Sequence, residues 1–251
     1  MFKHLVSSVV GVAALALAGS ASAATYISKL EYREAAGVAT VPAYGTVKLE
    51  DGLDGGTRVR VTVEFTDPDT LFVETGSKYP FTFKLLDSPN STVSVVSGVG
   101  PDWQALNEGL YKVAAFTSNT NNDNDGTKFN RAIVCCAGNG ASNGVLAPMV
   151  FDVVNASGIT FAGVGAQVDQ NGRLVGLGTG NRFTSTSRGW WFTADIWDPN
   201  AGTNGATFAV GAKDAFVVNT PVPEPTTWAL MIAGFGGAGA VLRRQRRAAM
   251  A

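Results

Sequence analysis

Histidine is almost absent from this 251-residue chain, and the only one is His4, close to the start. Histidine is the usual general base beside a nucleophilic serine or cysteine, and it is a common zinc ligand. The chain after His4 therefore lacks the group that Ser-His-Asp catalysis, Cys-His catalysis and histidine-ligated metal sites require. This absence favours a protein that is not an enzyme.

Charge is also scarce, because charged residues make up 16% of the chain, whereas about 25% is usual in globular proteins. The net charge is -1, which gives no reason to expect nucleic acid as a partner. The charges are unevenly placed. Residues 24–222 carry 14 basic and 19 acidic side chains, and the last 29 residues carry four arginines and one glutamate. The sequence therefore predicts an acidic body and a C-terminal end of opposite charge.

Residues 1–23 have the pattern of a secretory signal peptide. Lys3 and His4 precede an apolar stretch from Leu5 to Ala18, and Ala21-Ser22-Ala23 provides a small-residue cleavage site. A short transmembrane anchor or a buried helix is the alternative, but the stretch is about half the length of a usual membrane span. We expect a signal helix, cleavage before Ala24, and export of the rest.

The C-terminal end divides into three segments. Residues 221–227 form a proline-rich spacer that cannot be helical, since each proline removes a donor and restricts the residue before it. Residues 228–242 are uncharged and apolar, and as a helix they would span about 22 Å, against a hydrocarbon core of about 30 Å. The spacer threonines and Trp228 can extend this span into the interface. We expect a single transmembrane helix rather than a buried helix of the body.

The closing segment, residues 243–251, is basic through Arg243, Arg244, Arg246 and Arg247. Arginines beside a membrane span hold that end in the cytoplasm. Export of the body through its signal peptide requires the same orientation. Two independent signals therefore place the body on the outer side of the membrane, with a C-terminal anchor.

The tail resembles the PEP-CTERM sorting signal in its PEPxxWA form. The likeness is carried by Pro223, Glu224 and Pro225, then Trp228-Ala229, a glycine-rich apolar run and the arginine cluster, and it covers residues 221–247. The resemblance implies a Gram-negative exosortase substrate, with Pro223-Glu224-Pro225 as the recognition tripeptide and processing nearby. It also implies a transient membrane anchor, a destination at the cell surface or outside the cell, and association with exopolysaccharide or biofilm matrix.

The body, residues 24–220, shows short runs that alternate between apolar and polar residues. The clearest is Thr57 to Thr66, in which Val59, Val61 and Val63 share one face. The other runs include Tyr26–Tyr32, Tyr111–Phe116 and Gly163–Val168. Turn signals such as Asp51-Gly52 separate the runs, and Asn171-Gly172 marks the best hairpin. Only Asp102–Asn107 suggests a helical turn. We expect an all-β body of ten to twelve antiparallel strands, arranged as a β-sandwich or jelly roll.

Two local patterns suggest a metal site and a disulfide bond. Asn121, Asp123 and Asp125 place oxygen ligands at alternate positions, as calcium prefers, but Ala132 stands where an EF-hand has its bidentate glutamate. A solvated turn is the alternative, and no other cofactor is indicated.

Cys135 and Cys136 are the only cysteines, and they could form a local disulfide, remain buried thiols or pair with another chain.

The stretch from Trp190 to Asp198 is the best candidate for a carbohydrate site. As a strand it would put Trp190, Phe192, Ala194 and Ile196 in the core, with Trp191, Asp195 and Trp197 on the other face. Indoles stack on sugar rings and a carboxylate accepts hydroxyl hydrogen bonds. The alternative is that both faces are covered.

The leading hypothesis is a non-enzymatic surface or matrix protein. A carbohydrate-binding module is the second hypothesis. A secreted hydrolase that uses Asp169, Asp195 or Asp198 is the third, and it would need two carboxylates about 5–10 Å apart in a cleft.

Overall fold

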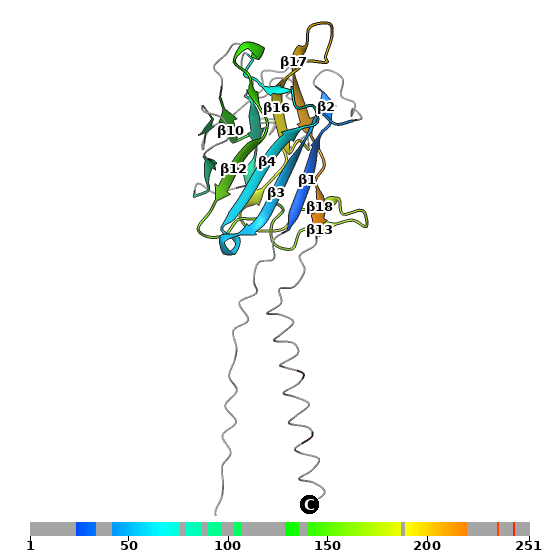
Figure 1. Cartoon of the computed structure of the whole chain (residues 1–251). Helices are drawn as coiled ribbons and strands as arrows, with labels where there is room; N and C mark the ends of the chain where they lie inside the picture. The colour runs from blue at the N-terminus through cyan, green and yellow to red at the C-terminus, as the bar shows by residue number, and fades with distance from the viewer. Residues whose placement is uncertain are drawn as a thin grey trace, which may run out of the picture.

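The computed structural model describes residues 24–33, 42–75, 79–86, 90–96, 103–106, 129–135, 140–186 and 189–219, together with Phe235 and Arg243. The described part of the body consists of antiparallel strands, most of which form two large sheets that lie face to face (Figure 1), and the others form two small two-stranded sheets. The prediction of an all-β body is therefore confirmed. The predicted signal helix, residues 1–23, lies outside the described residues. The predicted transmembrane helix, residues 228–242, also lies outside them, apart from Phe235.

The first large sheet has six strands, and its alternating sequence explains why it forms. Their order is β18 (Phe216–Asn219), β1 (Thr25–Leu30), β3 (Gly45–Leu53), β4 (Arg58–Phe65), β12 (Met149–Val154) and β8 (Thr92–Val95). In β4 the three valines Val59, Val61 and Val63 are fully buried, while Arg58, Arg60 and Thr62 lie on the other face. This strand confirms the alternation predicted for Thr57 to Thr66.

The second large sheet has eight strands. Its path is β11 (Val145–Leu146), β5 (Leu71–Phe72), β16 (Phe192–Asp198), β6 (Phe81–Phe83), β10 (Arg131–Val134) and β9 (Gln104–Leu106), and β17 (Ala206–Ala212) pairs with β16 and β2 (Tyr32–Arg33). The chain passes from the first sheet to the second at Glu31, whose N–H donates to the Gly211 carbonyl at 3.2 Å. The run predicted as one strand, Tyr26–Tyr32, is thus shared between two sheets.

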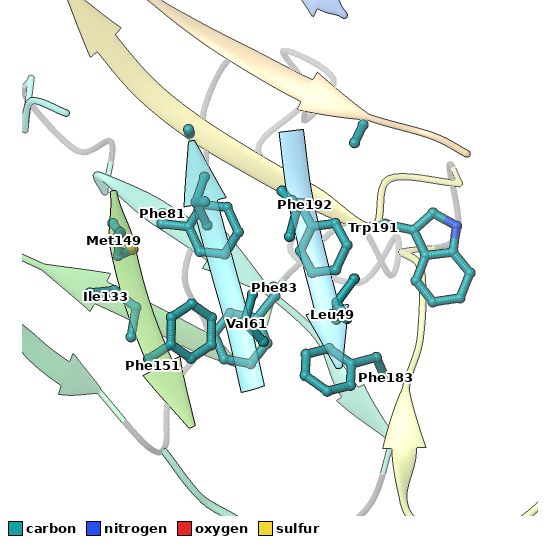
Figure 2. Packing of buried hydrophobic residues seen from close by; sticks show 14 of the residues in the cluster. Leu49, Val61, Phe81, Phe83, Ile133, Met149, Phe151, Phe183, Trp191 and Phe192 are labelled. Atoms are coloured by element: carbon teal, nitrogen blue, oxygen red, sulfur yellow. The ribbon is translucent and has the colours of Figure 1, made fainter. Parts of the chain in front are cut away.

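Aromatic side chains fill the space between the sheets (Figure 2). Phe151 of β12 lies 5.1 Å from Phe83 and 5.8 Å from Phe81 of β6, measured between ring centroids. These three side chains are fully buried. Burying one such ring contributes about 1.5–3 kcal/mol, so this aromatic layer holds the two sheets together.

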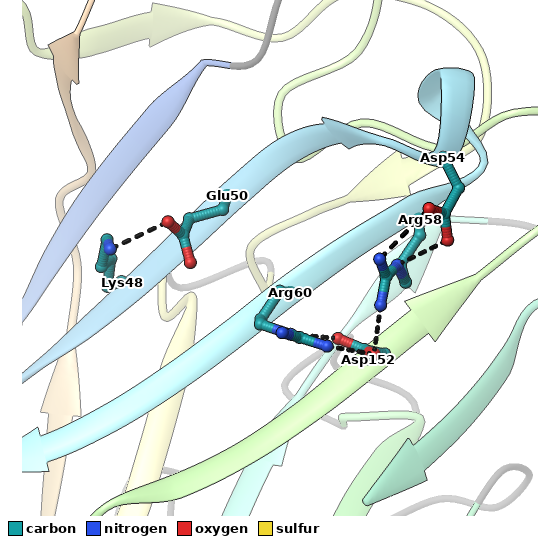
Figure 3. A network of polar contacts seen from close by, with 6 residues as sticks. All are labelled: Lys48, Glu50, Asp54, Arg58, Arg60 and Asp152. Carbon is teal, nitrogen blue, oxygen red and sulfur yellow. Dashed lines mark hydrogen bonds and ion pairs between the residues drawn. The ribbon is translucent and has the colours of Figure 1, made fainter. Parts of the chain in front are cut away.

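The outer face of the first sheet, which points away from the core, is held by cross-strand ion pairs (Figure 3). Arg60 donates two hydrogen bonds to Asp152 at 2.9 and 3.0 Å, and Arg58 donates a third at 3.0 Å. Partial burial alone would raise the pKa of Asp152, but the hydrogen bonds from Arg60 and Arg58 outweigh it and hold that pKa below its usual value. Arg60 and Asp152 are register partners, so strand pairing sets this contact.

Several local predictions are corrected by long-range pairing. The helical turn expected at Asp102–Asn107 is wrong, because β9 is extended and pairs with β10. The turn expected at Asp51-Gly52 lies inside β3, where Gly52 has a φ of 75° and the register shifts between Glu50 and Leu53. Such a shift is a bulge that a glycine permits. The strand expected at Tyr111–Phe116 lies outside the described residues.

Candidate functional site

The last strand of the body leads directly into the C-terminal tail. β18 ends at Asn219, two residues before Pro221, and Asn219 is the register partner of Thr25 in β1. Thr25 also pairs with Glu50, which brings the β3–β4 turn η1 (Asp54–Gly56) to the same end. We name this end, formed by Ala24–Thr25, η1 and Asn219, the terminal pole (lower end of the body in Figure 1). Both predicted targeting segments therefore join the body at one place.

β18 is held on its second side by the hairpin of β13 (Gln167–Val168) and β14 (Leu174–Gly176). The Val217 N–H donates to the Gly172 carbonyl at 2.8 Å, and the Leu174 N–H donates to the Ala215 carbonyl at 2.8 Å. The turn needs glycine at position 172, since its φ is 77° and a Cβ there would lie 3.0 Å from the Val217 oxygen. The predicted Asn171-Gly172 hairpin is confirmed, and the tail starts from a strand bonded on both sides.

A buried carboxylate ties this pole together. Asp51 of β3 is 4% exposed, and both its side-chain oxygens accept the Phe161 N–H, at 2.8 and 2.9 Å. The Asp51 N–H donates to the Ala24 carbonyl at 2.9 Å. Burial raises the pKa of Asp51 to about 7, although the Phe161 hydrogen bond opposes the change. Burial and the Asp51 charge together raise the pKa of Tyr26 to about 12.

The open platform predicted from Trp191, Asp195 and Trp197 does not form. Trp191 is 8% exposed and its ring lies 4.9 Å from Phe161 in the core, while Asp195 is fully buried and accepts the backbone N–H of Thr75 at 2.8 Å and the Thr75 hydroxyl. Trp197 is half-buried against Gly205. The alternative, that both faces of the strand are covered, describes what the structure shows for these three residues.

The prediction placed Trp191 wrongly because it started the strand at Trp190, two residues too early. β16 begins at Phe192, so the alternation does not extend back through Trp191 and Trp190. Phe192, Ala194 and Ile196 lie in the main core as predicted, but Trp191 joins them and Trp190 packs in a separate cluster with Phe129 and Ala209. Lys213 lies over the Trp190 ring, with its Nζ 4.4 Å from the centroid. Trp191 therefore lies in the main core, where the sequence predicted Trp190, and Trp190 lies outside that core.

The aspartates named for a hydrolase have structural partners. Asp169 accepts the N–H groups of Asn171 and Arg173 in the hairpin turn, and Asp198 accepts the N–H of Asn200. Among the described residues, no three His, Cys, Asp or Glu side chains gather as a metal site would require. The candidate calcium ligands Asn121, Asp123 and Asp125 lie outside the described residues.

The remaining predicted sites are only partly described. Cys135 is disulfide-bonded, whereas Cys136, the other cysteine of the chain, lies outside the described residues. Of the sorting residues, Arg243 alone is described, and it is exposed. Pro223, Glu224, Pro225, Trp228, Arg244, Arg246 and Arg247 lie outside. Within the ranges that the structure describes, no helix has the length and apolar character of a membrane span.

Sequence reasoning missed Asp51 and β18. Asp51 follows Val47 and Leu49 on the inward face of β3, and this alternation was the available signal, but Gly52 made the segment resemble a turn. β18 is four residues long and its partners, β1 and the hairpin, are distant in sequence.

The fold and its ends define an all-β body joined at one pole to a C-terminal sorting segment. The family model described as the PEP-CTERM protein-sorting motif matches residues 221–247. The chain therefore carries a PEP-CTERM sorting signal, as the resemblance of its tail implied, and this signal indicates sorting to the cell surface by exosortase. No curated protein and no solved structure matches the chain.

Proposed function

We propose that the chain is a non-enzymatic surface or matrix protein whose tail holds it in the inner membrane until exosortase processes it. The observation that carries this proposal is the position of the motif relative to the fold. Every strand of the described body lies between Thr25 and Asn219, and the motif begins at residue 221. Processing near Pro223-Glu224-Pro225 would remove no strand, so the folded body can leave the membrane intact.

A non-catalytic role is supported by the chemistry of the body. The sequence has no histidine after His4. Among the described residues three aspartates are buried, and each holds parts of the fold together: Asp51 binds the Phe161 N–H, Asp152 binds two arginines, and Asp195 binds Thr75. A glycosidase needs two carboxylates that face one substrate. The proposed destination is the exopolysaccharide matrix, where a stable, weakly charged sandwich would act as a structural component.

Replacing Pro223, Glu224 and Pro225 together by alanine should abolish most surface delivery. We expect the wild-type protein in the surface and matrix fractions as a shortened form. The variant should accumulate at full length in the inner membrane, because the apolar run and arginines still anchor it. Immunoblots of fractionated cells of the native host measure both the size and the location of the protein.

The matched control is Pro221→Ala, which removes a proline of the same spacer outside the tripeptide and should leave delivery unchanged. If the triple variant reaches the surface at the wild-type level and size, exosortase processing is not the route and the proposal fails. Because β18 ends at Asn219, neither variant alters the folded body, so misfolding does not confuse the comparison.

A further inference from the structure

Exposed aliphatic side chains gather near the terminal pole. Among the described body residues, eight large apolar side chains are exposed, and five of them belong to the stretch 164–177 or to β18. Those five are Val164 at 73%, Val168 at 46%, Val175 at 58%, Leu177 at 37% and Val218 at 53%. Single exposed apolar residues are normal on protein surfaces, but this grouping in one part of the fold calls for a physical reason.

Hydrogen bonds place this stretch across the terminal pole. The Ile159 N–H donates to the Gly56 carbonyl of η1 at 2.9 Å, and the Phe161 N–H donates to Asp51. Val164 then pairs with Thr179, and Gly172 bonds to Val217 of β18. Figure 1 shows β13 beside β18 at the lower end of the body. The exposed aliphatic residues therefore lie beside the point where the tail leaves.

The charged groups in this region are engaged within the protein. Arg173 and Asp214 form an ion pair at 2.6 Å, and Asp54 and Arg58 form one at 2.8 Å. Asp169 caps the hairpin turn. A surface whose charges are internally paired loses less hydration energy when it approaches a bilayer than one with isolated charges.

The tail is short enough to bring this pole to the membrane. From Asn219 to Trp228 the proline-rich chain extends at most about 30 Å. The apolar run spans about 22 Å as a helix, which is less than the hydrocarbon thickness of about 30 Å. A short span draws its flanking residues into the headgroup layer. Part of the spacer would then lie in the headgroup layer, which shortens the link between the membrane and the body. The end of the body nearest the bilayer is therefore the terminal pole.

We propose that, before processing, the terminal pole rests on the outer surface of the inner membrane, with Val164, Val175 and Leu177 in the lipid headgroup layer. This inference rests on the proposed function, because the tail supplies the tether. A small apolar contact alone binds membranes weakly and reversibly, and stable anchoring needs a second element. Cutting the tail would leave only the weak contact, so processing would release the body from the lipid.

The test uses the chain from Ala24 to Ala251, tail included, in vesicles of phosphatidylethanolamine and phosphatidylglycerol. An NBD fluorophore is attached at Val164→Cys or Val175→Cys, and Leu146→Cys is the control. Leu146 is 54% exposed, close to the 58% of Val175, but its strand β11 pairs with β5 beside Trp197, away from the terminal pole. Labelling without reductant preserves the disulfide at Cys135. Emission wavelength and quenching by spin-labelled lipids report lipid contact.

We expect blue-shifted emission and lipid quenching at positions 164 and 175, and aqueous emission at position 146. Aqueous emission at all three sites in protein that floats with the vesicles overturns the inference while leaving the anchor intact. Protein that fails to float contradicts the anchor, and the proposed function with it. Protection at 164 and 175 that requires added exosortase assigns the surface to that enzyme and also overturns the lipid contact.

Discussion

Replacing Phe161 by alanine is expected to lower the free energy of unfolding of the body by about 3–5 kcal/mol. Phe161 is fully buried, and its ring centroid lies 4.9 Å from both Tyr26 and Trp191 and 5.6 Å from Phe183. It therefore joins β1, the segment before β16, and β15 (Arg182–Phe183) beneath the terminal pole. The close packing around it leaves little room for the cavity to collapse.

Denaturant unfolding of the chain from Ala24 to Thr220, which contains every described strand, measures this loss. The control is Val164→Ala, three residues away but 73% exposed, which should change stability by less than about 0.5 kcal/mol. Since small domains are stable by only about 5–15 kcal/mol, the Phe161 variant should unfold at a clearly lower denaturant concentration. Equal midpoints for the two variants would contradict the packing described for the pole.

Lowering the pH from about 7 to 3.8 is expected to stabilise the body, and Asp51 is the reason. Its pKa is raised from 3.8 to about 7 by burial. Between these two values the folded state holds a proton that the unfolded chain does not, so stability falls as the pH rises through the interval. The contribution is complete below the unfolded pKa and lost above the folded one. This pKa difference corresponds to a change on the order of 4 kcal/mol.

Asp51→Asn isolates this effect, because the amide oxygen still accepts the Phe161 N–H but does not titrate. We expect the variant to lose most of the pH dependence between the unfolded and folded pKa values of Asp51. Asp69→Asn changes an exposed carboxylate instead and should keep the wild-type slope. Thermal unfolding followed by circular dichroism across this pH range compares the three proteins. A wild-type body whose stability rises with pH would show that Asp51 is not the controlling group.

The parts of the fold that could be predicted are those whose pattern is local. The valines of β4 alternate without interruption, and Asn171-Gly172 has the composition of a tight hairpin turn, so both were predicted correctly. The stretch Gly163–Val168 failed as a strand because Gly163 and Gly165 adopt φ values of 86° and 80°. Its last two residues form β13, and Val164 pairs with Thr179 only through an isolated bridge. Alternation alone does not reveal where the backbone leaves the strand conformation.

In the candidate site, too, the features set by local sequence were predicted and those set by long-range contacts were not. The tail was predicted from the order of its own residues, and the family model matches the same range, 221–247. The terminal pole was not predicted, because it depends on β18 meeting β1 and on Asp51 meeting Phe161, more than a hundred residues apart along the chain. Trp191 was misplaced by a single-residue change in strand phase.

The measurement that tests the central claim most directly is the intact mass of the protein recovered from the surface of its native host. A chain that starts at Ala24 and ends before Trp228 is the predicted result, since the tail would then have served as an anchor and been removed. Surface material whose mass still includes residues 228–247 would contradict the account, because the body would have reached its destination without losing its membrane segment.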